Sequence, residues 1–240
     1  MQNQGRLTVS VVSHGQRDMV ARVLAQLADL GNPDIVLVVV VHNLPDQDLP
    51  KPPHATFALI QIHNPKPIGF AANHNQAFQH CHTKWFAVLN PDLEFPFGDP
   101  FPALLAAGEA DPTLGMLAPL LIDPDTMQSE PNRGGVTPYE IIRRRLPGWK
   151  PPEKPTWLVG AFLCIRREAF ESARGFDTRF RLYCEDVDLS LRFQNEGWLI
   201  ARIADAQALH RAQRNSQRKI RYTIMHLESL IKLWVRNWCV

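Results

Sequence analysis

The sequence predicts an α/β fold in which helices cover a parallel sheet, and three observations favour it. In the first ninety residues, segments with strand-like patterns alternate with segments of helical periodicity. The run at residues 35–41 is apolar at every position, as in a parallel strand buried on both faces. The polar clusters Ser13-His14, His42-Asn43 and Asn90-Pro91-Asp92 each follow a predicted strand. Because ligands of such sheets bind beyond the carboxyl ends of the strands, these clusters are the first candidates for a site.

The elements of this half follow in order. A strand at residues 7–12 precedes a helix whose apolar side chains, from Met19 to Leu30, share one face, and Gly31-Asn32-Pro33 ends that helix. After the apolar run we expect a third strand, a helix and a fourth strand, at residues 57–62, 70–80 and 84–89. His74, His80 and His82 crowd this second helix without a nearby carboxylate in sequence, so we interpret them as packing or surface residues.

The second half is less regular. Residues 123–155 have low periodicity and many prolines, and a loop this long in a compact domain is usually functional or mobile. After it we expect a strand at residues 157–165, a short helix ending near Ala169 and a longer helix at 185–195. A strand at 198–203 and a final helix at about 217–238 follow.

Composition limits the class of protein. A chain of 240 residues, 45% hydrophobic and 21% charged, is typical of a soluble protein with one large or two small domains. No signal peptide is visible, and the longest apolar run falls far short of the roughly 20 residues that span a bilayer. The four cysteines form no CxxC pair, so we expect reduced thiols. Together these features predict a cytoplasmic protein.

Charge is unevenly distributed. Residues 211–240 hold seven basic residues and one acidic residue, while the remaining 210 hold 19 basic and 23 acidic residues. Apolar residues recur at helical spacing in this basic tail, and two interpretations are open. The helix lies on an anionic membrane surface, or it packs on the core with its basic side in solvent. No aromatic-basic recognition pattern accompanies the tail, so we expect no nucleic-acid partner. The sequence leaves the oligomeric state open.

Phosphate-binding motifs of other families are absent. The turn Ser13-His14-Gly15-Gln16-Arg17 does not match GxGxxG, and the sequence has no Walker A motif. A metal held by carboxylate is the usual substitute for neutralising a diphosphate, and Asp92, after an apolar strand, is suited to hold one. Alone, Asn90-Pro91-Asp92 is also an ordinary turn signal.

Several motifs together resemble the family 2 glycosyltransferases. Leu89-Asn90-Pro91-Asp92 resembles the LNPD variant of their DxD motif. Gly69-Phe70-Ala71-Ala72-Asn73-His74-Asn75 resembles the element after their third strand. Val159 to Arg167 resembles their GAxxxxRR strand, and Gly175-Phe176-Asp177 with Tyr183 to Arg192 resembles their GFD and ED blocks. His210 stands where the family has a histidine after its last core strand. The opening Val11-Val12-Ser13-His14-Gly15 is similar to bacterial rhamnosyltransferases of this family.

The resemblance implies a GT-A fold, with a mixed, mostly parallel sheet, helices on both faces and a Rossmann-like N-terminal half. It implies one domain over residues 1–210, with a nucleotide-binding half at 1–95 and an acceptor and catalytic half at 96–210. Residues 211–240 form a basic helical extension.

The resemblance also assigns roles. Asp92 and His210 hold a divalent metal, Mn²⁺ or Mg²⁺, and an imidazole ligand favours Mn²⁺. Asp186 is the general base, and Glu185 contacts the acceptor or positions the base, together with Trp157 and Gly160 on the acceptor side. Asp188 is mainly structural, since acids in a first helical turn stabilise the helix dipole. The nucleotide-binding residues are Ser13, His14, His42, Asn43, Gly69, Phe70, Asn75, Asn90 and Asp92.

One departure concerns base recognition. The family commonly has Asp-Asn after its second strand, and this chain has His42-Asn43. A neutral imidazole can accept the hydrogen bond of the base, but His42 can equally be a simple strand-end residue, so uridine and thymidine carriers stay open.

The resemblance predicts an inverting glycosyltransferase in cell-surface polysaccharide synthesis. It moves a sugar, rhamnose from dTDP-rhamnose in the first instance, from a nucleotide-diphosphate donor to a hydroxyl of a saccharide or polyprenyl-diphosphate-linked acceptor. Arg143, Arg144, Arg145 and Trp149 are candidates to seat such an acceptor at the inner leaflet of the membrane, where the enzyme would lie peripherally. The alternative is a non-catalytic module that binds nucleotide sugar or a membrane surface. A nucleotidyltransferase is disfavoured because its Gly-rich, Arg-bearing first turn is missing.

Overall fold

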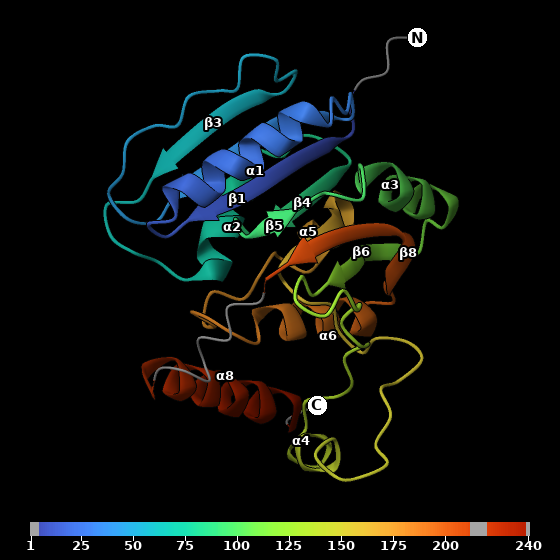
Figure 1. The fold of residues 1–240 in the computed structure, drawn as a ribbon. Helices are drawn as coiled ribbons and strands as arrows, with labels where there is room; N and C mark the ends of the chain where they lie inside the picture. The colour runs from blue at the N-terminus through green and yellow to red at the C-terminus, as the bar shows by residue number, and fades with distance from the viewer. Residues whose placement is uncertain (1–4, 212–219, 239–240) are drawn as a thin grey trace.

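The computed structural model describes residues 5–211 and 220–238, and its centre is one eight-stranded sheet (Figure 1). The strand order is β3-β2-β1-β4-β7-β6-β8-β5. The pairs β1–β2, β1–β4, β2–β3 and β6–β8 are parallel, and β4–β7, β6–β7 and β5–β8 are antiparallel. The sheet is therefore mixed and mostly parallel, as expected.

The strands are β1 (Leu7–Ser13), β2 (Ile35–His42), β3 (Ala58–His63), β4 (Trp85–Leu89), β5 (Leu93–Glu94), β6 (Leu114–Ile122), β7 (Phe162–Arg166) and β8 (Leu199–His210). The helices are α1 (Arg17–Asp29), α2 (Phe70–Phe78), α3 (Phe101–Ala110), α4 (Pro138–Arg143), α5 (Arg167–Ser172), α6 (Glu185–Asn195) and α8 (Ile220–Trp238).

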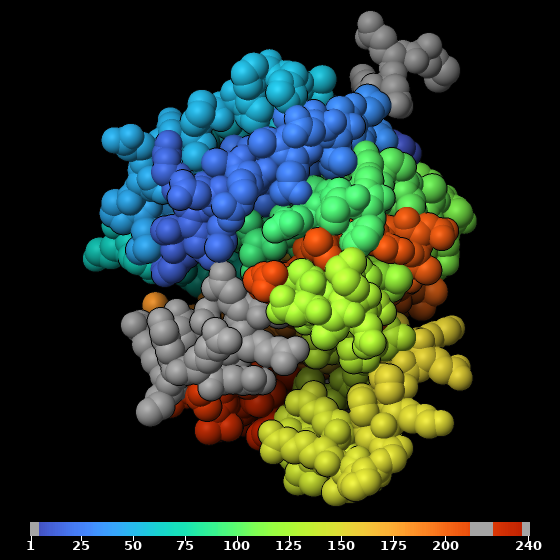
Figure 2. Space-filling view, in the orientation of Figure 1, coloured from blue at the N-terminus to red at the C-terminus, as the bar shows by residue number. Residues whose placement is uncertain are grey.

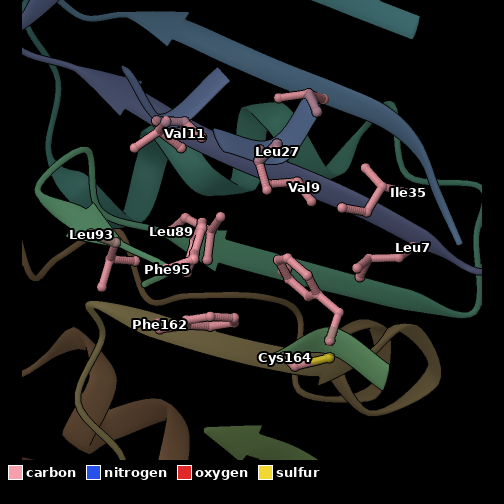
Figure 3. Close-up of a cluster of buried hydrophobic side chains, with 14 of the residues drawn as sticks. Leu7, Val9, Val11, Leu27, Ile35, Leu89, Leu93, Phe95, Phe162 and Cys164 are labelled. Carbon is pink, nitrogen blue, oxygen red and sulfur yellow. The ribbon is translucent and has the colours of Figure 1, made fainter. Parts of the chain in front are cut away.

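Helices cover both faces of the sheet and bury two apolar clusters. The larger cluster joins α1 and α3 to one face of the strands. Figure 3 shows side chains of this cluster along the strands, among them Val9, Leu89 and Phe162. The smaller one joins α2, α5 and α6 to the opposite face. In β2, residues Val38 and Val40 enter one cluster while Val39 and Val41 enter the other. A strand buried on both faces needs apolar residues at every position, which explains the unbroken apolar run.

Two boundaries differ from the sequence-based expectation. The strand expected at 157–165 begins only at Phe162, because residues before it form an isolated bridge between Trp157 and Arg133 rather than a ladder. The strand expected at 198–203 continues to His210, because β8 pairs with β6 and then with β5. This extension delivers His210 to the carboxyl end of β4.

Helix α8 combines features of both interpretations of the basic tail. Leu230 and Leu233 are buried against α6, and the Trp234 indole donates a hydrogen bond to the Val136 carbonyl at 2.7 Å. The side chains of Ile224, Leu227, Ile231 and Val235, at helical spacing, are exposed. We call these four residues the α8 apolar stripe. The expected start of this helix near residue 217, and the basic residues Arg214, Arg218 and Lys219 of the tail, lie outside the described residues.

Among the described residues, no helix has both the length and the apolar character needed to cross a membrane.

Candidate active site

The carboxyl ends of β1, β2 and β4 open into a cleft of about 530 Å³. Ten residues that the sequence predicts as site residues line it together. They are His14, Asn43, Gly69, Phe70, Asn90, Asp92, Gly160, Glu185, Asp186 and His210. The cleft also contains residues that sequence reasoning missed, among them Asn73, Arg181 and Met225. Asp92 and Asp186, which come from opposite halves of the chain, thus share one cavity.

Strand pairing brings Asp92 and His210 together. Leu93 pairs with His210 across β5 and β8, so Asp92 stands directly beside the histidine ring. The Asp92 Oδ1 and His210 Nε2 atoms are 3.7 Å apart. Asp92 Oδ1 is buried and has no hydrogen-bond partner among the described residues. Burial raises the pKa of Asp92, and the nearby His210 opposes that rise. A buried carboxylate oxygen without a donor is a costly arrangement unless a cation occupies the space beside it.

Glu130 completes this cluster and was missed by sequence reasoning. Its Oε1 atom lies 3.8 Å from His210 Nδ1, on the far side of the ring from Asp92, and its carboxylate pairs with Arg133. Burial alone would raise the pKa of Glu130, but His210 and Arg133 outweigh it and lower the pKa to about 2. Glu130 lies in the irregular segment after β6 and belongs to no motif, so no sequence signal marked it.

These residues fit a divalent metal. Asp92 offers an oxygen, His210 offers Nε2, and Glu130 faces the other ring nitrogen. Metal-bound histidines commonly have a carboxylate in this second position, because it fixes the tautomer that leaves one nitrogen free. A mixed oxygen and imidazole set suits Mn²⁺ better than Mg²⁺.

Asp186 is held at the start of α6 on the other side of the cleft. Its Oδ2 accepts a hydrogen bond from the Gly160 N–H at 2.9 Å, and its Oδ1 accepts one from the Val187 N–H at 2.8 Å. A Cβ at position 160 would lie 3.3 Å from the Asp186 Cβ, so a glycine there lets the backbone approach. Burial raises the pKa of Asp186, and these backbone hydrogen bonds oppose the rise. The carboxylate is therefore both fixed in direction and more basic than an exposed one.

The backbone before α6 is strained. Tyr183 and Cys184 have φ values of 70° and 66°, in the left-handed region that non-glycine residues rarely adopt. Two such residues in succession are typical of functional sites, where the surrounding structure maintains the strain. They turn the chain so that Glu185 and Asp186 both reach the cleft.

Glu185 and Asp188 have different environments. Glu185 is buried, and its Oε2 has no hydrogen-bond partner among the described residues. Burial, with the neighbouring charge of Asp186, raises the pKa of Glu185 well above 4.5. Asp188 forms ion pairs with Arg192 and Arg236, both at 2.8 Å, which agrees with its expected structural role.

On the donor side, Asn43 organises the loop before α2. Its Oδ1 accepts hydrogen bonds from the Ile68 N–H and the Asn64 side chain, at 2.8 and 3.1 Å. Its Nδ2 donates to the Ile68 carbonyl at 2.9 Å and lies 3.0 Å from His14 Nδ1. A Cβ at Gly69 would lie 2.6 Å from the Arg181 carbonyl oxygen, so close packing of two backbones requires glycine there.

A family model described as glycosyl transferase family 2 matches residues 8–173. The chain belongs to glycosyl transferase family 2. It is 36% identical over 144 residues to the N-acetylglucosaminyl-diphospho-decaprenol L-rhamnosyltransferase of Mycobacterium tuberculosis strain H37Rv, covering 52% of this chain and 46% of that protein. It is 33% identical over 61 residues to the rhamnosyltransferase WbbL of Escherichia coli K12, covering 25% and 23% of the two chains. The chain thus spans about half the length of the mycobacterial relative.

Solved structures show the GT-A fold of this family 2 member. The mannosyltransferase PcManGT from Pyrobaculum calidifontis, in complex with GDP-Man and Mn²⁺, matches with a TM-score of 0.68 at 18% identity. The match covers 98% of this chain and 65% of that one. GalNAc-T7 with UDP, GalNAc and Mn²⁺ matches with a TM-score of 0.64 at 15% identity, over 88% and 44% of the two chains.

Four residues of the expected site do not line the cleft of this family 2 domain. Ser13 is buried at the end of β1, where strand alternation turns its side chain inward. Asn75 instead supports the turn after α5, because its side chain bonds both the N–H and the carbonyl of Phe176. Trp157 donates to the Gly134 carbonyl at 2.9 Å and lines a separate apolar groove.

His42 is the fourth of these residues. Its Nε2 contacts the Gln61 side chain at 3.0 Å, and its ring stacks on His63 with centroids 4.4 Å apart. His42, Asp48 and His63 bring three potential metal ligands together. The two imidazoles are parallel within 4°, however, so their in-plane lone pairs do not converge on one ion. The strand-end interpretation of His42 therefore describes its contacts best.

Of the histidines near α2, His74 is a packing residue, as expected. It is fully buried, contacts the Ser10 hydroxyl at 2.8 Å and packs edge-on against Phe70. Burial lowers its pKa to about 3, so the ring is neutral.

Proposed function

We propose that this chain is an inverting glycosyltransferase that transfers a sugar from a nucleotide-diphosphate donor to a hydroxyl of a lipid-diphosphate-linked saccharide. The observation that carries the proposal is the shared cleft of Asp92 and Asp186. Glycosyl transfer needs stabilisation of a leaving diphosphate and removal of a proton from the attacking hydroxyl. The two carboxylates suit these two tasks.

In the proposed reaction, Asp186 accepts the proton of the acceptor hydroxyl as its oxygen forms a bond to the anomeric carbon. The bond from that carbon to the diphosphate oxygen breaks, and the electron pair leaves with the nucleoside diphosphate. Asp92 and His210 would hold a divalent ion, which supplies positive charge to the leaving diphosphate. One displacement from the face opposite the leaving group inverts the anomeric centre.

For the donor we propose rhamnose from dTDP-rhamnose, and for the acceptor a GlcNAc-diphospho-polyprenol. The names of the mycobacterial and Escherichia coli relatives support the sugar, and the name of the mycobacterial relative supports the acceptor. On the donor side, Asn43, His14 and the turn at Gly69 and Phe70 would contact the nucleotide.

We also propose a peripheral location on the cytoplasmic face of the membrane, where a polyprenyl-linked acceptor would be met. The α8 apolar stripe and the exposed Tyr139, Ile142 and Leu146 support it, because such residues are rarely left in solvent together. Arg143, Arg144 and Arg145 add positive charge beside them, which suits an anionic leaflet. Figure 2 shows the segment around α4 and part of α8 at the same end of the molecule.

The test is a transfer and binding screen with dTDP-rhamnose, UDP-GlcNAc, UDP-Gal, UDP-Glc and GDP-Man, with and without Mn²⁺. The acceptor is GlcNAc-diphosphate carrying a prenyl chain. We expect Mn²⁺-dependent transfer from dTDP-rhamnose, and inversion is read from the NMR coupling of the product. Failure to bind any nucleotide sugar would sink the proposal. Binding without transfer would favour a non-catalytic module.

A further inference from the structure

An apolar groove of about 660 Å³ lies between the segment leading into α4, helix α6 and helix α8. Buried Val187 and Leu233 form its floor, and half-buried Val136, Trp157, Leu191 and Trp234 form its walls. None of its lining residues carries a charge. Its volume lies within the roughly 300–1,000 Å³ usual for small-molecule sites. The groove therefore has the lining and the size of a site for an apolar chain.

The groove adjoins the active cleft across α6. Val187 directly follows Asp186, whose carboxylate faces the cleft, so one turn of α6 contributes to both cavities. Ser190, one turn further along, links the same elements: its hydroxyl accepts a hydrogen bond from the Leu158 N–H and donates to the Asp186 carbonyl. A molecule that presents a hydroxyl to Asp186 thus lies close to the apolar groove.

Arg133 lies at the wall of the groove and acts on the cleft. The Arg133 guanidinium stands 5.8 Å over the ring of Trp157, at the wall of the groove. Burial raises the pKa of Asp186 in the cleft, and the charge of Arg133 is among the influences that oppose this rise. Burial and the charges of Arg133 and Arg145 lower the pKa of Arg144, which places three guanidinium groups near one another. Clustered cations repel unless an anion lies between them, and Glu130 already pairs with Arg133.

The charge of Arg144 acts on His226 of helix α8. Arg144 contributes, after burial, to lowering the pKa of His226. The His226 ring packs edge-on against Tyr183, with centroids 4.9 Å apart, and Tyr183 lines the cleft. The charge of Arg144 thus acts on a histidine that packs against a residue of the cleft, while Arg133 stands at the wall of the groove.

We propose that this groove binds the first isoprene units of a polyprenyl-diphosphate acceptor, with Arg133 and Arg144 contacting the diphosphate. The inference rests on the proposed function and locates the lipid chain and the diphosphate of the acceptor on the protein. The order of chemical groups agrees: hydroxyl at Asp186, diphosphate at the arginines, apolar chain in the groove. The lining of the groove includes Pro138 of α4 and Leu233 and Trp234 of α8, and these two helices also carry exposed apolar side chains. Figure 1 shows α4 and α8 at the same end of the molecule.

The first experiment compares two acceptors in detergent with the donor found in the screen: GlcNAc-diphosphate carrying a farnesyl group, and the same compound carrying a methyl group. Leu191→Trp should fill the groove and lower the ratio of kcat/KM for the farnesyl over the methyl acceptor at least tenfold. Leu199→Trp, the matched control at an exposed position at the start of β8, should leave the ratio unchanged. If Leu191→Trp folds and the ratio of kcat/KM is unchanged, the proposal that the groove binds the isoprene chain is overturned. No transfer to either acceptor by the unsubstituted chain overturns the proposed function instead.

A second measurement covers the case in which Leu191→Trp does not fold. A farnesyl diphosphate analogue with a photoreactive diazirine on its chain is bound to the unsubstituted protein without divalent ion, so that the metal-dependent donor site does not compete. We expect labelling of peptides that contain Trp157, Leu191 and Trp234. Labelling that is confined to other peptides overturns the proposal.

A separate substitution tests the proposed contact between the arginines and the diphosphate. Arg144→Gln should raise KM for both diphosphate acceptors severalfold, while Arg22→Gln, an exposed control on α1, should not. In the binding assay, farnesol should bind more weakly than farnesyl diphosphate to the unsubstituted protein, and this difference should be smaller in Arg144→Gln, which retains Arg133. Equal binding of the two ligands to the unsubstituted protein overturns a role for the arginines.

Discussion

On the donor side of the cleft, Asn43 and its neighbours satisfy one another's hydrogen bonds; on the acceptor side, Glu185 does not find such partners. Asn43 shares hydrogen bonds with Asn64, His14 and the backbone of Ile68, so this part of the donor wall is complete before a ligand arrives. Across the cleft, Glu185 is buried with an oxygen that lacks a partner among the described residues. An amide network of this kind gives a rigid binding surface, since breaking it leaves buried groups unsatisfied.

The difference teaches how the two tasks of the cleft are divided. Neutral amides that are already paired position a ligand without a change of charge. Carboxylates that burial makes more basic are suited to accept a proton, because general bases work best with a pKa near the working pH. Substitutions that weaken the function of one side of the cleft should therefore leave the function of the other side intact.

Asp186→Asn tests this division with the largest expected effect. Without the carboxylate, the acceptor hydroxyl has no base, and transfer should fall by about 10²- to 10⁴-fold. Nucleotide binding, measured by calorimetry, should be unchanged, because the donor wall is separate. Asp205→Asn, at an exposed position of β8, is the control and should retain full transfer. A rate within about tenfold of the unsubstituted chain contradicts the role of Asp186 as base.

Glu130→Gln tests the metal cluster between the two sides. If Glu130 fixes the His210 tautomer, its loss should weaken Mn²⁺ binding about 10- to 100-fold, the usual effect of removing such a partner. Mn²⁺ affinity is measured by electron paramagnetic resonance of the free ion, without donor or acceptor. Glu153→Gln, an exposed substitution in the same irregular segment, should have no effect. Equal affinities for the two variants would mean that Glu130 does not orient the ring.

The sequence predicted large parts of both sides of the cleft. Strands β1, β2 and β4 and helices α1 and α2 agree with expectation within a few residues, because local periodicity and turn residues determine them. The parallel arrangement then places His14, Asn43 and Asp92 at one edge of the sheet. The start of α6 was also predicted, since Glu185 and Asp186 belong to a family motif.

What sequence reasoning missed depends on tertiary contacts. Glu130 reaches His210 through the path of an irregular segment, and no local pattern encodes that path. Asn75 lies within a family motif, yet it serves a turn about a hundred residues away, at Phe176. The left-handed Tyr183 and Cys184 were not foreseen either, because side chains at these positions do not favour that conformation. The elements α3, β5 and β6 received no prediction at all.

Asn43→Ala tests the completeness of the donor wall. The Ile68 N–H loses its acceptor, while the Asn64 amide keeps Asn73 Oδ1 as a partner. A buried unsatisfied donor costs about 1–3 kcal/mol. The free energy of unfolding in urea should fall by that order, and KM for the nucleotide sugar should rise because the loop before α2 loosens. Mn²⁺ affinity should stay as it is. Gln47→Ala, which removes an exposed amide nearby, should change neither quantity. A chain as stable as the unsubstituted one would show that the amide network does not hold this wall.

Glu185→Gln tests the acceptor wall through the pH dependence of folding stability. We expect this substitution to have the smallest effect of the four. The pKa of Glu185 is raised above 4.5 in the folded chain, so the carboxyl keeps its proton where the unfolded chain has lost it. The contribution of Glu185 to folding stability is therefore complete at pH values below the pKa that this group has in the unfolded chain. It is lost as the pH rises through the pKa that the group has in the folded chain. Urea unfolding between about pH 5 and pH 8 should show a decline in stability that Glu185→Gln makes shallower. The decline should persist in part, since the pKa of Asp186 is also raised, and Glu168→Gln, at an exposed position of α5, should reproduce the unsubstituted profile. Superimposable profiles for Glu185→Gln and the unsubstituted chain would show that Glu185 ionises freely, and the contrast between the two walls would then rest on Asp186 alone.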